Sequence, residues 1–153
     1  MPVVFTSGDI FEQGPKALAH GCNCAGAMGK GIAKEFKRRW PKMFKEYRRR
    51  CAVGEFYLGD VFVWKENGWT IFNLGTQKTW TTKANPNAIE QSLRRMLDLA
   101  KQMDVRQIDL PRIGAGLGGL DWEVVREVIE KVATSSPITL RVFETYQPHK
   151  SPP

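Results

Sequence analysis

The chain has 153 residues, of which 42% are hydrophobic and 25% are charged, and its formal net charge at pH 7 is +7. These values are typical of one folded domain, and the lack of any apolar run of about 18 residues excludes a transmembrane helix. The first residues lack a basic region followed by an apolar run, so we expect no signal peptide. The positive charge favours a polyanionic or phosphate-bearing partner.

Hydrophobic periodicity and turn residues define the elements expected along the chain. In order, they are strand 3–6, strand 17–20, helix 29–40, helix 41–50, strand 61–65, strand 69–74, a helix from 87 with apolar positions to 103, strand 107–110, helix 122–132 and strand 138–143. Asn67-Gly68 favours a hairpin. Asn87 and Glu90 are typical of a capping box that opens a helix, and Asp121 is expected to cap the last helix.

Strands alternate with helices along most of the chain, with one hairpin between them. This order predicts an α/β fold in which helices cover both faces of a mixed central sheet. We expect one domain over residues 1–146. The polar, proline-rich segment 147–153 is expected to form a flexible tail.

Two glycine-rich loops, 23–33 and 111–120, each follow a strand and open a helix. The N–H groups and positive dipole end of a helix N-terminus favour phosphate, and glycine lets the backbone approach an anion. Two such loops at one edge of a sheet could clamp a diphosphate between them. Each loop alone could instead be a tight turn, because neither is a Walker motif or a complete dinucleotide fingerprint.

Cys22, Cys24 and His20 lie close together in the sequence, as metal ligands or a redox pair would. A second pair of ligands at zinc-site spacing is missing, so we expect no metal and no cofactor. Cys22 is expected in the core, Cys24 beside a pocket, and His20 in packing or hydrogen bonding. An odd number of cysteines argues against a disulfide framework and predicts a cytoplasmic protein. We also expect a monomer that does not associate with membranes.

The segment 34–50 carries nine lysines and arginines. It is either a solvated helical face or a patch that attracts nucleic acid. Its aromatic residues, spaced by 4, 4 and 3 positions, are Phe36, Trp40, Phe44 and Tyr47. That spacing favours a core-facing helical stripe, although the same rings could stack on bases.

Several ordered motifs together resemble the macro domain family. The resemblance is to the subclass with terminal ADP-ribose glycohydrolases, DNA ADP-ribosyl glycohydrolase antitoxins and ADP-ribose 1″-phosphate phosphatases. The matching segments are 8–10, 19–20, 23–24, 28–33, 36–37, 73–76, 110–114, 116–117 and 121–122. The resemblance covers about residues 3 to 145. It implies a three-layer α/β/α sandwich that binds ADP-ribose, free or attached to a macromolecule.

The resemblance also implies roles for individual residues. Asp9 would accept a hydrogen bond from the adenine amino group, with the N–H of Ile10 near the ring, and Asn23 would contact the distal ribose. Phe143 would pack on adenine. The other ligand-binding positions are Met28, Gly29, Lys30, Gly31, Ile32, Thr76, Gln77, Ile113, Gly114, Ala115, Gly116, Leu117 and Gly118. From the residues alone, Asp9 and Asn23 could merely hold turns, and Phe143 could belong to the core.

The catalytic position departs from the family pattern. Hydrolases of this subclass carry a lysine directly after the threonine that matches Thr76, whereas this chain has Gln77 there, followed by Lys78. Some members pair that lysine with an aspartate, at the position of Gly118. Glutamine is neither a strong nucleophile nor a charged group. We therefore expect Lys78 to be catalytic if the loop is shifted by one residue.

Three activities stay open at this point. The first is a hydrolase that removes mono-ADP-ribose from a nucleobase or an acidic side chain. The second is an ADP-ribose reader without catalysis, and the third is an ADP-ribose 1″-phosphate phosphatase. The basic segment 34–50 and Trp80 favour a substrate linked to nucleic acid.

Overall fold

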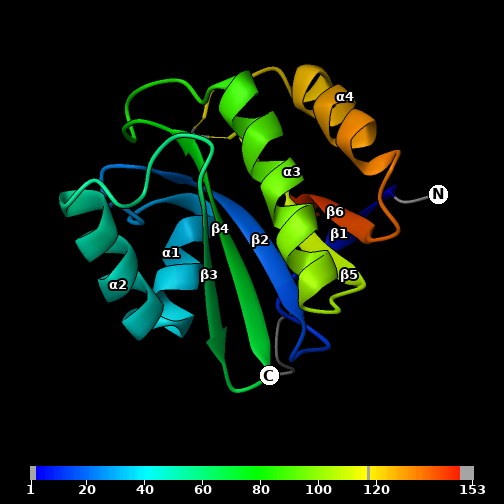
Figure 1. Ribbon diagram of the computed structural model, residues 1–153, viewed down its shortest axis with the longest axis horizontal. Helices are drawn as coiled ribbons and strands as arrows, with labels where there is room; N and C mark the ends of the chain where they lie inside the picture. Colours follow the sequence, from blue (N-terminus) through cyan, green and yellow to red (C-terminus); the bar gives the residue numbers. More distant parts are fainter. Residues whose placement is uncertain (1–2, 117, 149–153) are drawn as a thin grey trace.

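The computed structural model describes residues 3–116 and 118–148, which form one six-stranded sheet with helices on both sides (Figure 1). The strands are β1 (Val3–Gly8), β2 (Ala17–Asn23), β3 (Val61–Glu66), β4 (Trp69–Gln77), β5 (Gln107–Pro111) and β6 (Thr139–Tyr146). The helices are α1 (Gly31–Arg39), α2 (Pro41–Ala52), α3 (Pro86–Gln102) and α4 (Trp122–Ala133). None of these helices is both long and apolar enough to span a membrane.

The strand order is β1-β6-β5-β2-β4-β3. Every neighbouring pair is parallel except β3 and β4, which form the antiparallel hairpin expected from Asn67-Gly68. The five parallel strands therefore end at one edge of the sheet, and the loops that leave them meet there.

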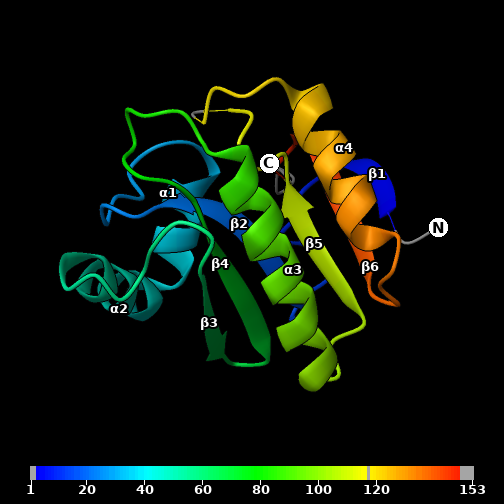
Figure 2. The same cartoon turned by 45° about the horizontal axis from the view of Figure 1, so that its top comes forward.

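Two hydrophobic clusters lie on opposite faces of the sheet. One packs α3 and α4 against alternate residues of the strands, including Phe72, Leu110 and Val142. The other packs α1 and α2 against the second face, with Phe36 and Tyr47 at its centre. Figure 2 shows α3 and α4 on one side of the sheet and α1 and α2 on the other. The predicted three-layer α/β/α sandwich with a mixed sheet is confirmed.

The aromatic residues of the basic segment belong mostly to the core. Phe36, Trp40 and Tyr47 are buried, and Phe44 is partly buried against them. Their spacing was thus that of a core-facing stripe, which leaves the lysines and arginines between them on the outside.

The start of α3 differs from the sequence prediction. The helix begins at Pro86, and the side chain of Asn85 accepts hydrogen bonds from the N–H groups of Asn87 and Ala88, at 2.9 and 3.2 Å. The predicted capping box at Asn87 and Glu90 is therefore wrong, because Pro86 at the first helical position already lets Asn85 act as the cap. The predicted cap of α4 by Asp121 is confirmed.

The segment after β6 was predicted to be a flexible tail from residue 147. The N–H of Gln147 donates a hydrogen bond to the carbonyl oxygen of Gly8 at 2.8 Å, which extends the contact between β6 and β1 by one residue. Residues 149–153 of the predicted tail lie outside the described residues.

Asn85 and Asn87 offer a direct test of this helix start. Asn85→Ala removes the cap and should lower the free energy of unfolding by about 1 kcal/mol. Asn87→Ala is the matched control, because its exposed side chain makes no capping bond, and should change stability by less than about 0.5 kcal/mol. Urea unfolding measures both. Equal losses in the two variants would contradict the observed cap.

Candidate functional site

A hollow at the carboxyl edge of the sheet lies between the two glycine-rich loops. This inter-loop cavity has a volume of about 350 Å³. The first loop contributes residues 30–33, the second contributes residues 111–114, 116 and 118, and Thr76 and Gln77 from the end of β4 complete the wall. The structure therefore brings both loops to one cavity. Leu117, also expected here, lies outside the described residues.

The first turn of α1 faces the inter-loop cavity without a cap. Lys30 is the N-cap residue and forms no side-chain capping bond, and the turn holds no acidic residue. In α3 and α4, by contrast, Asn85 and Asp121 cap the helix start. The N–H groups of Gly31 and Ile32, which line the cavity, are therefore open to an anion.

The second loop uses its carbonyl groups internally. The N–H of Leu120 donates to Gly114, that of Gly119 to Gly116, and that of Ala84 to Gly118, at 2.8–3.2 Å. A Cβ on Gly118 would lie 2.5 Å from the oxygen of Gly114, so only glycine fits there without a shift of the loop. Among the described residues, the N–H groups of Gly114, Gly116 and Gly118 have no acceptor. They can therefore serve as donors to a bound anion.

A second cavity of about 240 Å³ adjoins the first and shares Gly21, Lys30, Ala33 and Gln77 with it. We call it the tryptophan cavity, because Trp80 stands at its rim with 54% of its surface exposed. Its walls also include Asn23, Met28 and Gly29 of the first loop and Cys22 of β2. The ammonium group of Lys30 lies 5.1 Å from the centre of the Trp80 ring, so these two side chains form one rim.

Asn23 holds the shape of the first loop. Its Oδ1 accepts hydrogen bonds from the N–H groups of Ala25 and Ala27, at 3.0 and 3.2 Å, and its Nδ2 donates to the carbonyl of Ala27. The hydroxyl of Tyr47 donates to the Asn23 carbonyl at 2.7 Å, which ties the loop to α2. Asn23 thus has the turn-holding role considered from the sequence, while it also lines the tryptophan cavity.

Gln77 lines both cavities but is engaged with the loop after β4. Its Nε2 donates to the carbonyl groups of Thr79 and Thr82, at 2.8 and 3.0 Å. Lys78 is exposed and lines neither cavity, whereas Lys30 lines both. The amine that lines both cavities thus comes from the first loop, and the glutamine amide fixes the loop that carries Trp80.

Asp9 and Phe143, expected around adenine, line a third cavity of about 170 Å³. Asp9 accepts a hydrogen bond from the N–H of Phe11 at 2.9 Å, as a turn aspartate does. Phe143 is only 6% exposed, and the cations of Lys16 and Arg141 lie 5.7 and 5.1 Å from its ring centre. Ile10 is wholly buried in the core.

Two residues that line this third cavity, Lys16 and Arg141, belong to a charged triad that the sequence did not indicate. The buried carboxylate of Asp109 pairs with Lys16 at 2.8 Å and Arg141 at 2.6 Å. Burial raises the pKa of Asp109, but hydrogen bonds from Arg141 and Lys16 outweigh that effect and hold it below its usual value. The three residues come from distant parts of the chain, so no local pattern connects them.

His20 lies in a buried polar layer under the first loop. Its Nε2 is 2.6 Å from the Oδ1 of Asn73, its ring stacks on Phe36 at 3.8 Å, and Asn73 donates to the carbonyl of Phe62. Burial lowers the pKa of His20 to about 4, so the ring is neutral at physiological pH. Cys22 is also buried, and burial raises its pKa. In the described part of the chain, no group of three His, Cys, Asp or Glu side chains is placed to hold a metal.

A mixed α/β/α sandwich in which two glycine loops face one cavity with open backbone N–H groups is typical of domains that bind nucleotides. The sequence matches the macro domain family over residues 19–129, and the chain belongs to that family.

Two relatives are similar to this chain in sequence. The DNA ADP-ribosyl glycohydrolase of Mycobacterium tuberculosis is 35% identical over 130 residues, which are 82% of this chain and 37% of that protein. The ADP-ribose glycohydrolase OARD1 of Homo sapiens is 32% identical over 143 residues, which are 92% of this chain and 90% of that protein. This chain therefore spans little more than a third of the bacterial relative.

Two solved structures agree with the fold. The macrodomain of Thermus aquaticus DarG has a TM-score of 0.84 and 31% identity, covering 93% of this chain and 97% of that chain. The macrodomain of Mycobacterium tuberculosis DarG has a TM-score of 0.85 and 32% identity, covering 96% and 98%.

The buried imidazole predicts a pH dependence of stability. The pKa of His20 is about 4 in the folded protein against an ordinary value of 6.5, so the unfolded chain binds more protons between these pH values. The free energy of unfolding should therefore fall as pH decreases from 6.5 to 4. In His20→Phe, this part of the slope should vanish, whereas His149→Gln, which removes the other histidine, should keep it. Urea unfolding at several pH values measures the slopes, and an unchanged slope in His20→Phe would refute the assignment.

Proposed function

We propose that this macro domain binds ADP-ribose and hydrolyses the bond that joins it to a macromolecule. One observation carries the proposal: the uncapped first turn of α1 and the open N–H groups of the second loop face a single cavity. Backbone donors on two sides suit the two phosphates of a diphosphate. The relatives named as ADP-ribosyl glycohydrolases support the same ligand and reaction.

The three cavities suggest how the ligand would lie. The diphosphate would occupy the inter-loop cavity, and the adenine would lie toward Asp9, Ile10 and Phe143. The distal ribose would lie where the two adjoining cavities meet, beside Asn23 and Met28, with Lys30 and Gln77 on the shared wall. The group attached to that ribose would then enter the tryptophan cavity.

The reaction would be attack of water on the anomeric carbon of the distal ribose. The bond from that carbon to the attached group breaks, the water oxygen takes its place, and the leaving group receives a proton. The transition state has oxocarbenium character, so a nearby amine or carbonyl that orients water would assist it. The catalytic amine would be that of Lys78, and the loop at 78–82 would have to move this exposed side chain toward the cavity.

The alternative function is an ADP-ribose reader without catalysis. The observation in its favour is Gln77, which holds the position of the family lysine and uses its amide to fix the following loop.

The group attached to ADP-ribose is a nucleobase or an acidic side chain, and the exposed Trp80 favours the base. We also infer a monomer in the reducing cytoplasm, consistent with three free cysteines.

Binding of ADP-ribose is the first test. Calorimetry should detect binding of ADP-ribose to the wild-type protein. Gly118→Ala should weaken the affinity for ADP-ribose at least about tenfold, because the added Cβ collides with the Gly114 carbonyl and displaces the phosphate-facing backbone. Gly116→Ala tests the same loop without that collision, because a Cβ there meets no protein atom within 4 Å apart from its chain neighbours. The loop should keep its shape, so any loss of affinity in this variant reports contact with the ligand itself. No heat with the wild-type protein would disprove the proposal.

Two lysine variants test the catalytic group. Lys78→Ala should lower kcat about a hundredfold and leave the affinity for ADP-ribose within about twofold. Lys30→Ala should mainly weaken binding, because its side chain lines both cavities. Single-turnover assays on nucleobase-linked and glutamate-linked ADP-ribose measure both effects. Full activity in Lys78→Ala would exclude it as the catalytic residue. Tight binding without turnover would establish the reader, and phosphate release from ADP-ribose 1″-phosphate would establish a phosphatase.

A further inference from the structure

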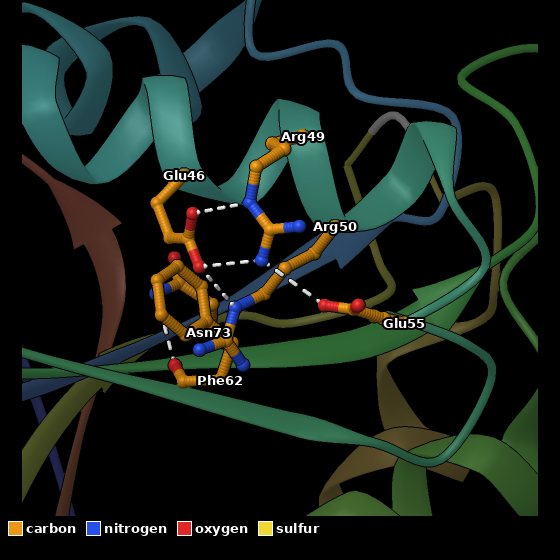
Figure 3. Close-up of polar contacts among 6 residues, drawn as sticks. All are labelled: Glu46, Arg49, Arg50, Glu55, Phe62 and Asn73. Carbon is orange, nitrogen blue, oxygen red and sulfur yellow. Dashed lines mark hydrogen bonds and ion pairs between the residues drawn. The ribbon is translucent and has the colours of Figure 1, made fainter.

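The cations of α1 and α2 fall into two groups. The first group pairs with glutamates on the same helices. Arg38 and Arg39 lie 2.8 and 3.6 Å from Glu35, and Arg49 and Arg50 lie 2.7 and 2.9 Å from Glu46. Figure 3 shows both arginines on Glu46, with Glu55 as a further partner of Arg49. These arginines contribute little free positive charge to the surface.

The second group has no acidic partner among the described residues. From this group, we call Lys34, Lys37 and Arg48, together with Lys30 at the N-cap of α1, the basic ridge. The group also contains Lys42 and Lys45 of α2, which are not part of the ridge. Positions 30, 34 and 37 share one helical face and extend over about 10 Å along the axis. The ammonium of Lys37 and the guanidinium of Arg48 lie 4.4 and 5.8 Å from the ring centre of Phe44, which joins the α1 and α2 parts of the ridge.

The basic ridge begins at the candidate site. Lys30 lines both cavities and lies over the ring of Trp80. Arg48 packs against the back of the first loop, where a Cβ on Gly26 would lie 3.1 Å from its Cγ. Unpaired positive charge thus runs from the mouth of the tryptophan cavity along α1 and onto α2, next to an exposed aromatic ring.

We propose that the basic ridge binds the phosphate backbone of a single-stranded nucleic acid whose modified nucleotide enters the tryptophan cavity. The inference rests on the proposed function, since it assigns the macromolecule attached to ADP-ribose. A row of unpaired cations beside an exposed aromatic ring suits a strand whose bases are free to stack. In a duplex, the base would first have to leave its neighbours before it reached Trp80. An acidic peptide would match the charge but would offer no base to the ring.

The test compares two triple variants with the same change in charge. The ridge variant is Lys34→Gln/Lys37→Gln/Arg48→Gln, which leaves Lys30 and both cavities intact. The control is Lys65→Gln/Lys101→Gln/Arg106→Gln, whose exposed cations lie at the opposite edge of the sheet. The probe is a short, unmodified single-stranded oligodeoxynucleotide, titrated by fluorescence anisotropy at several salt concentrations.

The ridge variant should bind the oligonucleotide at least about tenfold more weakly at low salt than the control. Its plot of log affinity against log salt should be shallower by about 2, because three phosphate contacts at about 0.7 each are lost. Equal affinities and slopes in the two variants would overturn the proposal. So would ridge-dependent binding of an acidic peptide with no binding of the oligonucleotide.

A second readout separates this inference from the proposed function. With ADP-ribosylated substrates, the ridge variant should show a raised KM for the oligonucleotide and an unchanged KM for the single nucleoside. Its affinity for free ADP-ribose should equal that of the control. If the wild-type protein fails to bind ADP-ribose, the proposed function fails whatever the oligonucleotide result. If ADP-ribose binds and KM for the oligonucleotide is unchanged in the ridge variant, only the ridge assignment fails.

Discussion

The parallel pairing of β1, β6, β5, β2 and β4 is the constraint on which the site depends. Parallel strands end together, so loops far apart in the sequence are delivered to one edge, where their backbone groups have no further strand to bond. The glycines at this edge allow close packing, as Gly118 does against Gly114. This geometry produces a cavity lined by open backbone N–H groups, with few charged side chains.

The first loop keeps its shape because polar groups beneath it are satisfied. Asn23 and Tyr47 hold it from the side of α2, and the His20–Asn73 pair forms a buried layer under it. No buried side-chain polar atom in the described residues lacks a hydrogen-bond partner. A neutral imidazole suits this layer, because a charged ring there would lose hydration without gaining a carboxylate partner.

Most of the fold was predictable because its elements carry local signals. Hydrophobic periodicity predicted the helices, the Asn67-Gly68 turn predicted the hairpin, and the glycine loops followed strands as expected. The start of α3 was misjudged because two cap patterns overlap within Asn85–Glu90, and Pro86 decides between them. The triad of Lys16, Asp109 and Arg141 was not predictable, because it needs the order of β2, β5 and β6 in the sheet.

Because some cations are paired and others are not, the unpaired positive charge is unevenly distributed over the surfaces of α1 and α2. Arg38, Arg49 and Arg50 have glutamate partners, whereas the four cations of the basic ridge have none, so part of the excess charge of +7 lies near the rim of the site. When a polyanion comes within a Debye length, about 8 Å at physiological ionic strength, its electric field would rotate the protein so that this rim faces it. Encounter would therefore be oriented before any side chain makes contact, and the association rate would decline as salt is added.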